Sequence, residues 1–595
     1  MTPVADADSV NTSVAMGRSN RRRQLRIVCR TLILIIAACH LWAVRYVTDP
    51  DGTAYVDVAR AWLRGDWAHA LNAYWSPLYI WLVAGAMAVF SPSAHWELPL
   101  IHAVDFLGFV LAFLAWEWLT SEWERWQGIS SQPMLTDITG YCVVLWAGLR
   151  MAGLGWFNNA DIIVMAVLIA CTAILIRAHR RVASPKHFIM LGLLLGIGFL
   201  AKTAFGVVIP AFLFALALIL RSWLDRRIAL TGLIAFAVVA PFVTALSLVH
   251  RRFTMGDSGR MNYSWQVTGI SVEGYKENAY WPGPEIRHPI HVLLQNPRVL
   301  SFEQHLVGTV PVHSDVSWWC EGYPVRFNKA RQLMILWSNI KFSIYAFRCP
   351  AVFLLLVCVP FGGFAIIRRF ARMWFLWAPG LILAASYCSV FSDYRYLAGS
   401  YALLGFSLIA AVWDVKLPPR VVSISLFAIP LLTAALTMGS SFRRLLPQLV
   451  GEFTGSNVPW DYVNVQVADT MQRSGLRPGD RVAYIGFSLN APHVGLEQAQ
   501  IVATIPERIT HDDTVWGRPL VFEFPRPHDF WRRSPEDQER VFAAFRSVGA
   551  KWVFADTVPK GADTAGWQVA GKFDGDSYKL RPGDEPYVYF RKLQD

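Results

Sequence analysis

Charged residues are scarce in this chain of 595 residues. Asp, Glu, Lys and Arg together make up 16% of the sequence, whereas 54% of it is hydrophobic and the mean hydropathy is +0.34. An average soluble protein carries about 25% charged residues. The composition therefore excludes a fully soluble protein and indicates many membrane spans, with room for one modest soluble domain.

Several familiar signatures are also missing. The sequence has no P-loop and no recognisable Ser-His-Asp or Cys-His arrangement, which argues against an ATP-driven pump and a hydrolase. No GxGxxG follows the expected strand 482–487, and no internal repeat is evident. No basic stripe is interleaved with aromatics, so no nucleic-acid partner is expected, and the net charge of +12 is typical of basic cytoplasmic loops.

Metal-binding and disulfide patterns are weak. None of the eight cysteines forms a CxxC, and only Cys320 and Cys349 are candidates for a disulfide outside the membrane. His102 and Asp105 lie three residues apart after Glu97, as a polar pair that packs helices or as part of a metal site lacking a third ligand. The remaining candidate histidines lack ligand spacing, so no metal cofactor is expected: His288, His291, His305 and His313.

Apolar runs predict a mainly α, polytopic membrane domain over residues 27–440. A polar, basic and disordered tail, residues 1–26, precedes it in the cytoplasm, without a cleaved signal. With eleven spans, every later basic cluster also faces the cytoplasm. The expected spans lie near 27–45, 98–119, 136–156, 160–177, 188–201, 204–220, 228–249, 349–367, 373–391, 395–412 and 421–438.

The apolar segment 78–90 is shorter than the roughly 18 residues of a span and is interpreted as a juxtamembrane or re-entrant helix. This topology places the loops 46–97 and 250–345 outside, together with the tail. Residues 451–595 alternate helical and β patterns, which predicts a periplasmic α/β domain with a small, partly parallel sheet. Polar residues thus collect on the outer side of the membrane.

The most informative stretch follows the first span. The segment Asp51–Trp67, continued by Tyr74–Tyr79, resembles the first external loop of GT-C glycosyltransferases, above all the protein-mannosyltransferase (family 39) and lipid A aminoarabinose transferase group. The resemblance implies a catalytic Asp51, with Tyr55 and Trp75 of the same motifs in the substrate site. Two alternatives stay open, because Asp51 could instead cap a helix and Asp49 could be the catalytic residue.

Three further residues are implied by the same resemblance. Asp161 follows an aromatic/Asn turn at the outer start of a span, as a supporting catalytic residue or a helix cap. Lys202 sits in a turn between two apolar runs, and Arg395 begins a late span; both are candidate phosphate ligands. For Lys202 the alternative is a side chain that snorkels to the interface.

The long loop 250–345 is rich in Trp and Tyr beside polar groups, including Arg260 and Asn262. Such clusters suit sugar binding, although an interfacial aromatic belt would look similar. We therefore expect an inverting glycosyltransferase of a bacterial cytoplasmic membrane, with Asp51 as general base. Its partners would be the bilayer, a polyprenyl-phosphate sugar donor and a glycan, lipid or protein acceptor. The alternatives are a polyprenol-linked lipid transporter or flippase and a non-catalytic assembly subunit.

Overall fold

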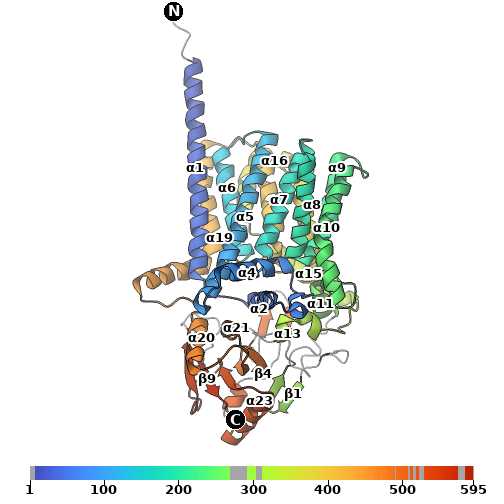
Figure 1. Ribbon diagram of the computed structural model, residues 1–595. Helices are drawn as coiled ribbons and strands as arrows, with labels where there is room; N and C mark the ends of the chain where they lie inside the picture. Colours follow the sequence, from blue (N-terminus) through green and yellow to red (C-terminus); the bar gives the residue numbers. More distant parts are fainter. Residues whose placement is uncertain are drawn as a thin grey trace, which may run out of the picture.

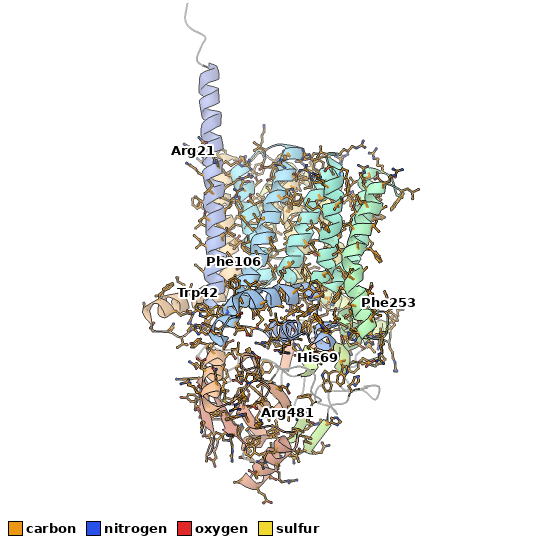
Figure 2. The ribbon with its side chains drawn as sticks, viewed as in Figure 1. Arg21, Trp42, His69, Phe106, Phe253 and Arg481 are labelled. Carbon is orange, nitrogen blue, oxygen red and sulfur yellow. The ribbon has the colours of Figure 1, made fainter. Side chains whose placement is uncertain are left out.

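The computed structural model describes residues 7–268, 288, 291–302, 311–488, 491–506, 510–513, 518–521, 528–573 and 583–593. A bundle of long helices forms one part, and a smaller sheet domain lies at the end of the bundle opposite the N-terminus (Figure 1). Arg21 marks the N-terminal end, whereas His69 and Arg481 lie toward the sheet domain (Figure 2). The expectation of a mainly helical membrane domain followed by a C-terminal α/β domain is confirmed at this level.

The helices of the bundle coincide with the apolar runs of the sequence. In the described part of the chain, seven helices are long and apolar enough to cross a membrane, so the full count of eleven spans stays a prediction. The bundle helices are α1 (Ala7–Ala43), α5 (Ala94–Gln127), α6 (Pro133–Trp146), α7 (Asp161–His179), α8 (Pro185–Ala201), α9 (Val208–Leu220), α10 (Arg226–Val249), α16 (Pro350–Arg372), α17 (Trp374–Cys388), α18 (Tyr394–Ala411) and α19 (Pro419–Thr454).

Helix α7 lies at the centre of the bundle. Of its 18 most apolar consecutive residues, 89% are buried, and the helix packs against α5, α8 and α18. A helix that is apolar on all sides belongs in a protein core or in lipid, and the neighbouring helices place α7 in the core. This position fixes the first residue of α7, Asp161, at the end of the bundle that faces the sheet domain.

The short apolar helix α4 (Pro77–Phe90) lies across the end of the bundle rather than along it (Figure 1). Helix α2 (Pro50–Arg64) packs against it on the side of the sheet domain. This arrangement agrees with the interpretation of 78–90 as a juxtamembrane helix. Both helices lie between the bundle and the sheet domain (Figure 1).

The N-terminal end of the bundle carries ion pairs. Helix α1 begins at Ala7, so the basic residues before 27 belong to this helix and not to a disordered tail. Arg22 and Arg26 both bind Asp137, at 2.7 and 2.9 Å. These pairs tie α1 to α6 at the end where the sequence places the cytoplasm.

The sheet domain has seven strands in the order β1-β2-β4-β3-β7-β9-β8. Strand β3 (Arg481–Gly486) pairs in parallel with β4 (Gln500–Pro506) and β7 (Trp552–Ala555). Helices α20 (Val463–Ser474) and α23 (Pro535–Ser547) pack their apolar residues onto the two faces of this sheet, in separate clusters. The expected partly parallel sheet is present. Strands β8 (Gln568–Lys572) and β9 (Tyr587–Lys592) extend it with antiparallel pairing.

Two strands of this sheet come from the long loop 250–345. The hairpin β1 (His291–Gln295) and β2 (Arg298–Ser301) joins the domain through antiparallel pairing of β2 with β4. Leu300 also belongs to the same apolar cluster as β3 and β7. The sheet domain is therefore a composite of the loop 250–345 and the tail 451–595, because the edge of β4 is covered by a distant segment.

The disulfide expected between Cys320 and Cys349 is wrong. Both cysteines are free and buried. Cys320 packs in an apolar cluster with Met261, whereas Cys349 packs in the core of the bundle. Each thiol serves as a small apolar side chain in its own cluster.

Candidate active site

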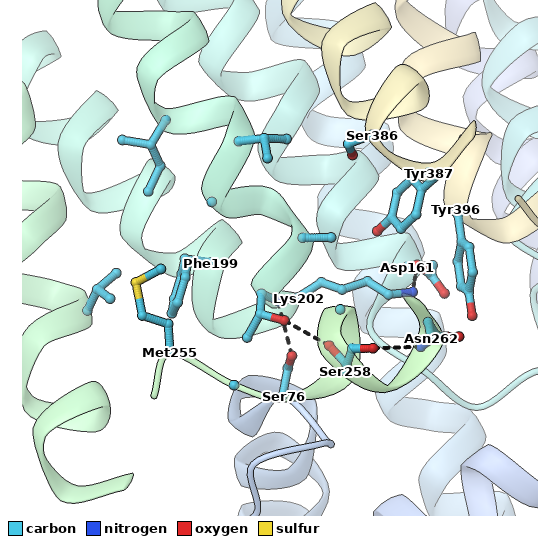
Figure 3. A pocket seen from close by; sticks show the side chains of 18 of the residues that line it. Ser76, Asp161, Phe199, Lys202, Met255, Ser258, Asn262, Ser386, Tyr387 and Tyr396 are labelled. Carbon is cyan, nitrogen blue, oxygen red and sulfur yellow. Dashed lines mark hydrogen bonds and ion pairs between the residues drawn. The ribbon is translucent and has the colours of Figure 1, made fainter. Parts of the chain in front are cut away.

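A cavity of about 800 Å³ lies where the bundle meets α2 and the external loop. Figure 3 shows Lys202 reaching Asp161 beside Tyr396, with Ser258 and Asn262 on the facing helix. Seven of the eight candidate site residues from the sequence line this cavity: Asp51, Tyr55, Trp75, Asp161, Lys202, Asn262 and Arg395.

The start of α2 separates the roles of Asp49 and Asp51. Asp49 is the N-cap, and its Oδ1 accepts hydrogen bonds from the backbone N–H of Gly52 at 3.0 Å and of Asn158 at 3.3 Å. Pro50 then takes the first helical position, where no N–H is needed. A Cβ at Gly52 would lie 2.7 Å from Thr48 Oγ1, so only glycine fits this close turn. Asp51, in the first turn, is left to face the cavity.

Arg395 joins the two carboxylates. Its Nη2 lies 2.5 Å from Asp51 Oδ2, and its Nη1 lies 3.5 Å from Asp49 Oδ2. The guanidinium also lies over the rings of Phe157 and Tyr396, at 4.9 and 5.2 Å. A planar fork of donors is suited to bridging two acids in this way.

The pair of acids has unequal proton affinities. Burial opposes ionisation of Asp51, but the charge of Arg395 and the contact from His313 outweigh it, so the pKa of Asp51 lies well below its usual range. Burial and the neighbouring charge of Asp51 raise the pKa of Asp49 to about 7. Asp51 is therefore the ionised member of the pair at neutral pH.

Lys202 and Asp161 form a second charged pair beside Tyr396. Lys202 Nζ lies 2.5 Å from Asp161 Oδ1 and 3.8 Å from the centre of the Tyr396 ring. Asp161 does not cap α7: it is the first residue of the helix, Ala160 holds the N-cap position, and no side chain makes a capping hydrogen bond. Its Oδ2 is buried and has no hydrogen-bond partner among the residues that the structure describes. Asp161 is thus the counter-ion of Lys202.

A buried polar network supports the Asp49 segment from behind. Asp105 accepts hydrogen bonds from the Tyr79 hydroxyl and from Asn158 Nδ2, each at 2.7 Å. His102 Nε2 is bonded to the carbonyl of Val47 at 2.9 Å. The first of the two interpretations of His102 and Asp105, a polar pair that packs helices, fits these contacts. In the described residues, no three His, Cys, Asp or Glu side chains come together as a metal site.

Tyr55 and Trp75 form an aromatic wall of the cavity. Their ring centroids lie 5.0 Å apart, and Tyr55 also contacts Tyr79 of α4 at 5.1 Å. Trp75 is fixed at both ends, since its backbone N–H is bonded to Asn72 and its ring Nε1 donates to the carbonyl of His313 at 3.1 Å. Rigid aromatic faces of this kind pack well on the apolar faces of sugars.

The two candidate residues of the loop 250–345, Arg260 and Asn262, differ in whether they line the cavity. Both lie on α11 (Ser258–Tyr263), which is tied to the bundle by a hydrogen bond between Ser258 and Thr203 at 3.0 Å. Asn262 lines the cavity. Arg260 points elsewhere: it donates to the carbonyl of Tyr323 at 3.3 Å and does not line the cavity. The aromatic cluster 280–284 of this loop lies outside the described residues.

The far half of the cavity is apolar. Its walls come from α8, η2 (Thr203–Val207), α9 and α10, and Val207 and Phe236 are 40% and 68% exposed on the outside of the bundle. One cavity therefore joins a charged head region to an apolar channel at the bundle surface. The residues of this apolar half include Phe199, Val207, Leu213, Phe236, Val239 and Met255.

Sequence reasoning missed His313. Its Nε2 lies 3.5 Å from Asp51 Oδ1, on the side away from Arg395. The sequence separates the two residues by more than 250 positions, and no spacing rule links them. The packing of α13 (Pro311–Ser314) on α2 brings this histidine to Asp51.

The comparison with protein families places part of the chain. Residues 75–244 match the family model described as dolichyl-phosphate-mannose-protein mannosyltransferase. The matched segment contains Trp75, Asp161 and Lys202 and lies between Asp51 and Arg395. The match confirms the resemblance of this multi-pass membrane protein to the GT-C glycosyltransferases of the protein-mannosyltransferase group. Among curated proteins, no sequence matches the chain.

The solved structures that resemble this one have low sequence identity to this chain. ArnT from Cupriavidus metallidurans bound to undecaprenyl phosphate has a TM-score of 0.49 and 14% identity, over 95% of this chain and 97% of that one. The oligosaccharyltransferase AglB from Archaeoglobus fulgidus, in complex with an inhibitory peptide and a dolichol-phosphate, has a TM-score of 0.38 and 12% identity, over 88% of this chain and 69% of that one. The family match, rather than these structures, carries the resemblance.

Proposed function

We propose that this chain is a glycosyltransferase that moves a sugar from a polyprenyl-phosphate donor to an acceptor at the outer face of a bacterial cytoplasmic membrane. The observation that carries the proposal is the cavity that joins two cations and two carboxylates to an apolar region at the bundle surface. A lipid-phosphate sugar has this division into a charged head and a long apolar chain. The name of the matching family model, which includes dolichyl-phosphate mannose, supports the same class of donor.

The donor phosphate would lie between Lys202 and Arg395. Both side chains contact the ring of Tyr396, and each has a carboxylate partner, Asp161 for Lys202 and Asp51 for Arg395. Charge-assisted hydrogen bonds from these cations would stabilise the phosphate as it leaves the sugar. The polyprenyl chain would follow the apolar half of the cavity between α9 and α10.

Asp51 would act as the general base. Its carboxylate faces the cavity and is ionised at neutral pH, so it can take the proton of the acceptor hydroxyl as the oxygen attacks the anomeric carbon. The bond to the phosphate breaks on the opposite face, which inverts the configuration. A bound phosphate would also pair with Arg395 and so weaken the attraction between Arg395 and Asp51. The Asp51 carboxylate would then be a stronger base.

The outer location rests on the distribution of charge. Helix α2, which carries Asp51, lies at the end of the bundle opposite Arg21 (Figures 1 and 2). Positively charged ends of membrane proteins face the cytoplasm. The composite sheet domain would then be periplasmic and lie beside the acceptor.

The test is sugar transfer from labelled polyprenyl-phosphate hexoses and pentoses by the purified protein in lipid nanodiscs. Lys202→Ala should raise the KM for the donor by about 10- to 100-fold, the value of one charge-assisted contact of about 1.5–3 kcal/mol. Lys186→Ala, an exposed lysine at the other end of α8, is the matched control and should behave as wild type. Movement of the lipid across the bilayer without any transfer of sugar would favour the transporter.

A further inference from the structure

The two oxygens of Asp51 have different charged or ionisable neighbours, Arg395 beside Oδ2 and His313 near Oδ1. Arg395 of α18 contacts Oδ2 at 2.5 Å, and His313 of the external loop lies 3.5 Å from Oδ1 through its Nε2. His313 is half-buried and does not line the cavity, whereas Asp51 does. The imidazole therefore lies behind the carboxylate and reaches a substrate only through it.

The backbone around His313 is fixed independently of its side chain. His313 lies on α13 (Pro311–Ser314), which packs on α2 (Figure 1). Trp75 Nε1 donates to the carbonyl of His313 at 3.1 Å, and the buried Asn72 Nδ2 donates to the carbonyl of Ser314 at 2.9 Å. A change of the imidazole would leave both of these anchors in place.

The segment 311–319, which we call the strap, also connects the site to the sheet domain. After α13 it continues into α14 (Val316–Trp319), where Trp319 packs in the apolar core of the sheet domain with Leu300 and Phe302. The strap thus lies between the composite sheet and α2. The strap places Nε2 of His313 3.5 Å from Oδ1 of Asp51.

The neighbourhood of His313 is mostly acidic. Imidazole is the side chain whose charge changes between pH 5 and 8. A carboxylate flanked by two cations holds a proton more weakly than a carboxylate flanked by one. Charged side chains of the described residues near this site include Asp49 at the N-cap of α2, Asp51, Asp57 and Arg60 of α2, Asp315 of the strap and Arg395 of α18.

We propose that His313 is a positioning residue for the transfer reaction, a role that rests on the proposed function. Neutral His313 orients Asp51 through Oδ1 and leaves it a competent proton acceptor. Protonated His313 gives Asp51 a second cationic neighbour beside Arg395 and suppresses its action as a base. The acceptor's proton goes to Asp51, and the rate is lower with protonated His313 than with neutral His313.

The decisive variant is His313→Gln, which keeps a hydrogen-bond donor of similar reach but cannot ionise. With sugar transfer from a polyprenyl-phosphate donor as the assay, turnover at pH 8 should fall about three- to thirtyfold from lost orientation, while the donor KM stays within about twofold. The decline of turnover between pH 8 and pH 5 should be strongly reduced in this variant. His313→Asn, with a shorter amide, should show the same loss of pH dependence and serves if the Gln variant is unstable.

The matched control is His288→Gln in the same external loop. His288 stacks on Trp318 at 3.6 Å and contacts Glu321 at 2.9 Å, away from the cavity. This variant should keep the rate and the pH profile of the wild type. A change of the profile in His288→Gln equal to that in His313→Gln would overturn the assignment.

Asp49 supplies the competing explanation, because burial and the charge of Asp51 raise its pKa to about 7 and it also contacts Arg395. If the acid decline persists in His313→Gln and disappears in Asp49→Asn, the role of His313 is refuted. Asp51→Asn separates the two proposals. Near-normal turnover of Asp51→Asn would refute Asp51 as the general base. An inactive Asp51→Asn, combined with a wild-type rate and pH profile of His313→Gln, would refute only the role of His313.

Discussion

Replacing Asp51 by Asn tests the proposed chemistry most directly. The amide keeps the size of the side chain and an oxygen that can accept from Arg395, but it cannot take the acceptor's proton. A positioned general base is worth about 10²–10⁴ in rate. Turnover should therefore fall by that factor, which corresponds to about 2.7–5.5 kcal/mol of transition-state stabilisation.

The stability of this variant should change modestly. From the sequence, Asp51 would be an exposed loop carboxylate whose loss costs almost nothing, but the structure shows it 26% exposed and paired with Arg395. Loss of one charge-assisted contact costs at most about 1.5–3 kcal/mol. Arg395 keeps Asp49 at 3.5 Å and the new amide oxygen, so the cost should lie at the low end of this range. A small decrease in melting temperature is expected.

The assay follows labelled sugar from a polyprenyl-phosphate donor in purified membranes, with protein level and melting temperature measured in parallel. Asp49→Asn is the comparison variant two positions away. Because Asn caps a helix about as well as Asp, the bonds to the N–H groups of Gly52 and Asn158 remain and most activity should survive. Near-normal turnover of Asp51→Asn would refute the reasoning, and loss in Asp49→Asn alone would move the base to Asp49.

Three further predictions concern Arg395, the sheet domain and the membrane topology. Arg395→Lys removes the fork that reaches two carboxylates, so turnover should fall about tenfold or more and donor KM should rise; unchanged kinetics would exclude Arg395 from the phosphate site. Residues 451–595 joined to the hairpin 291–301 should melt at a higher temperature than 451–595 alone, since β2 covers the edge of β4; equal melting would mean that the hairpin adds no stability. A periplasmic reporter fused after Ser456, beyond the end of α19, should be active, and activity of a cytoplasmic reporter there would invert the topology.

The candidate residues that the sequence singled out mostly come together, for a reason that the structure makes plain. Asp161 and Lys202 each stand at the end of a helix on the same side of the bundle, where apolar spans give way to polar turns. Arg260 shared the sequence environment of Asn262 but faces the carbonyl of Tyr323 instead, because two positions on a short helix point in different directions. Composition alone does not resolve such a difference.

What the sequence by itself determined was local. The lengths of the apolar runs set the helices of the bundle, and Asp49-Pro50 and Gly65 set the two ends of α2. These signals act within a few residues of the chain: a cap satisfies free N–H groups, and a glycine in the left-handed region, with φ of 70° at Gly65, ends the helix. A similar Ser-Pro sequence at Ser534 begins α23 in the tail.

Only the tertiary structure decided which carboxylate faces the cavity and what surrounds it. Asp49 and Asp51 carry the same side chain in neighbouring positions. Their roles separate because the N–H groups of Gly52 and Asn158 bind Asp49, whereas Asp51 takes the shorter of the two contacts from Arg395. The joining of β2 to β4 and the approach of His313 to Asp51 are contacts between segments about 200 residues or more apart. Such contacts depend on the edges, faces and charges that remain open after the local elements have formed, and no short stretch of sequence encodes them.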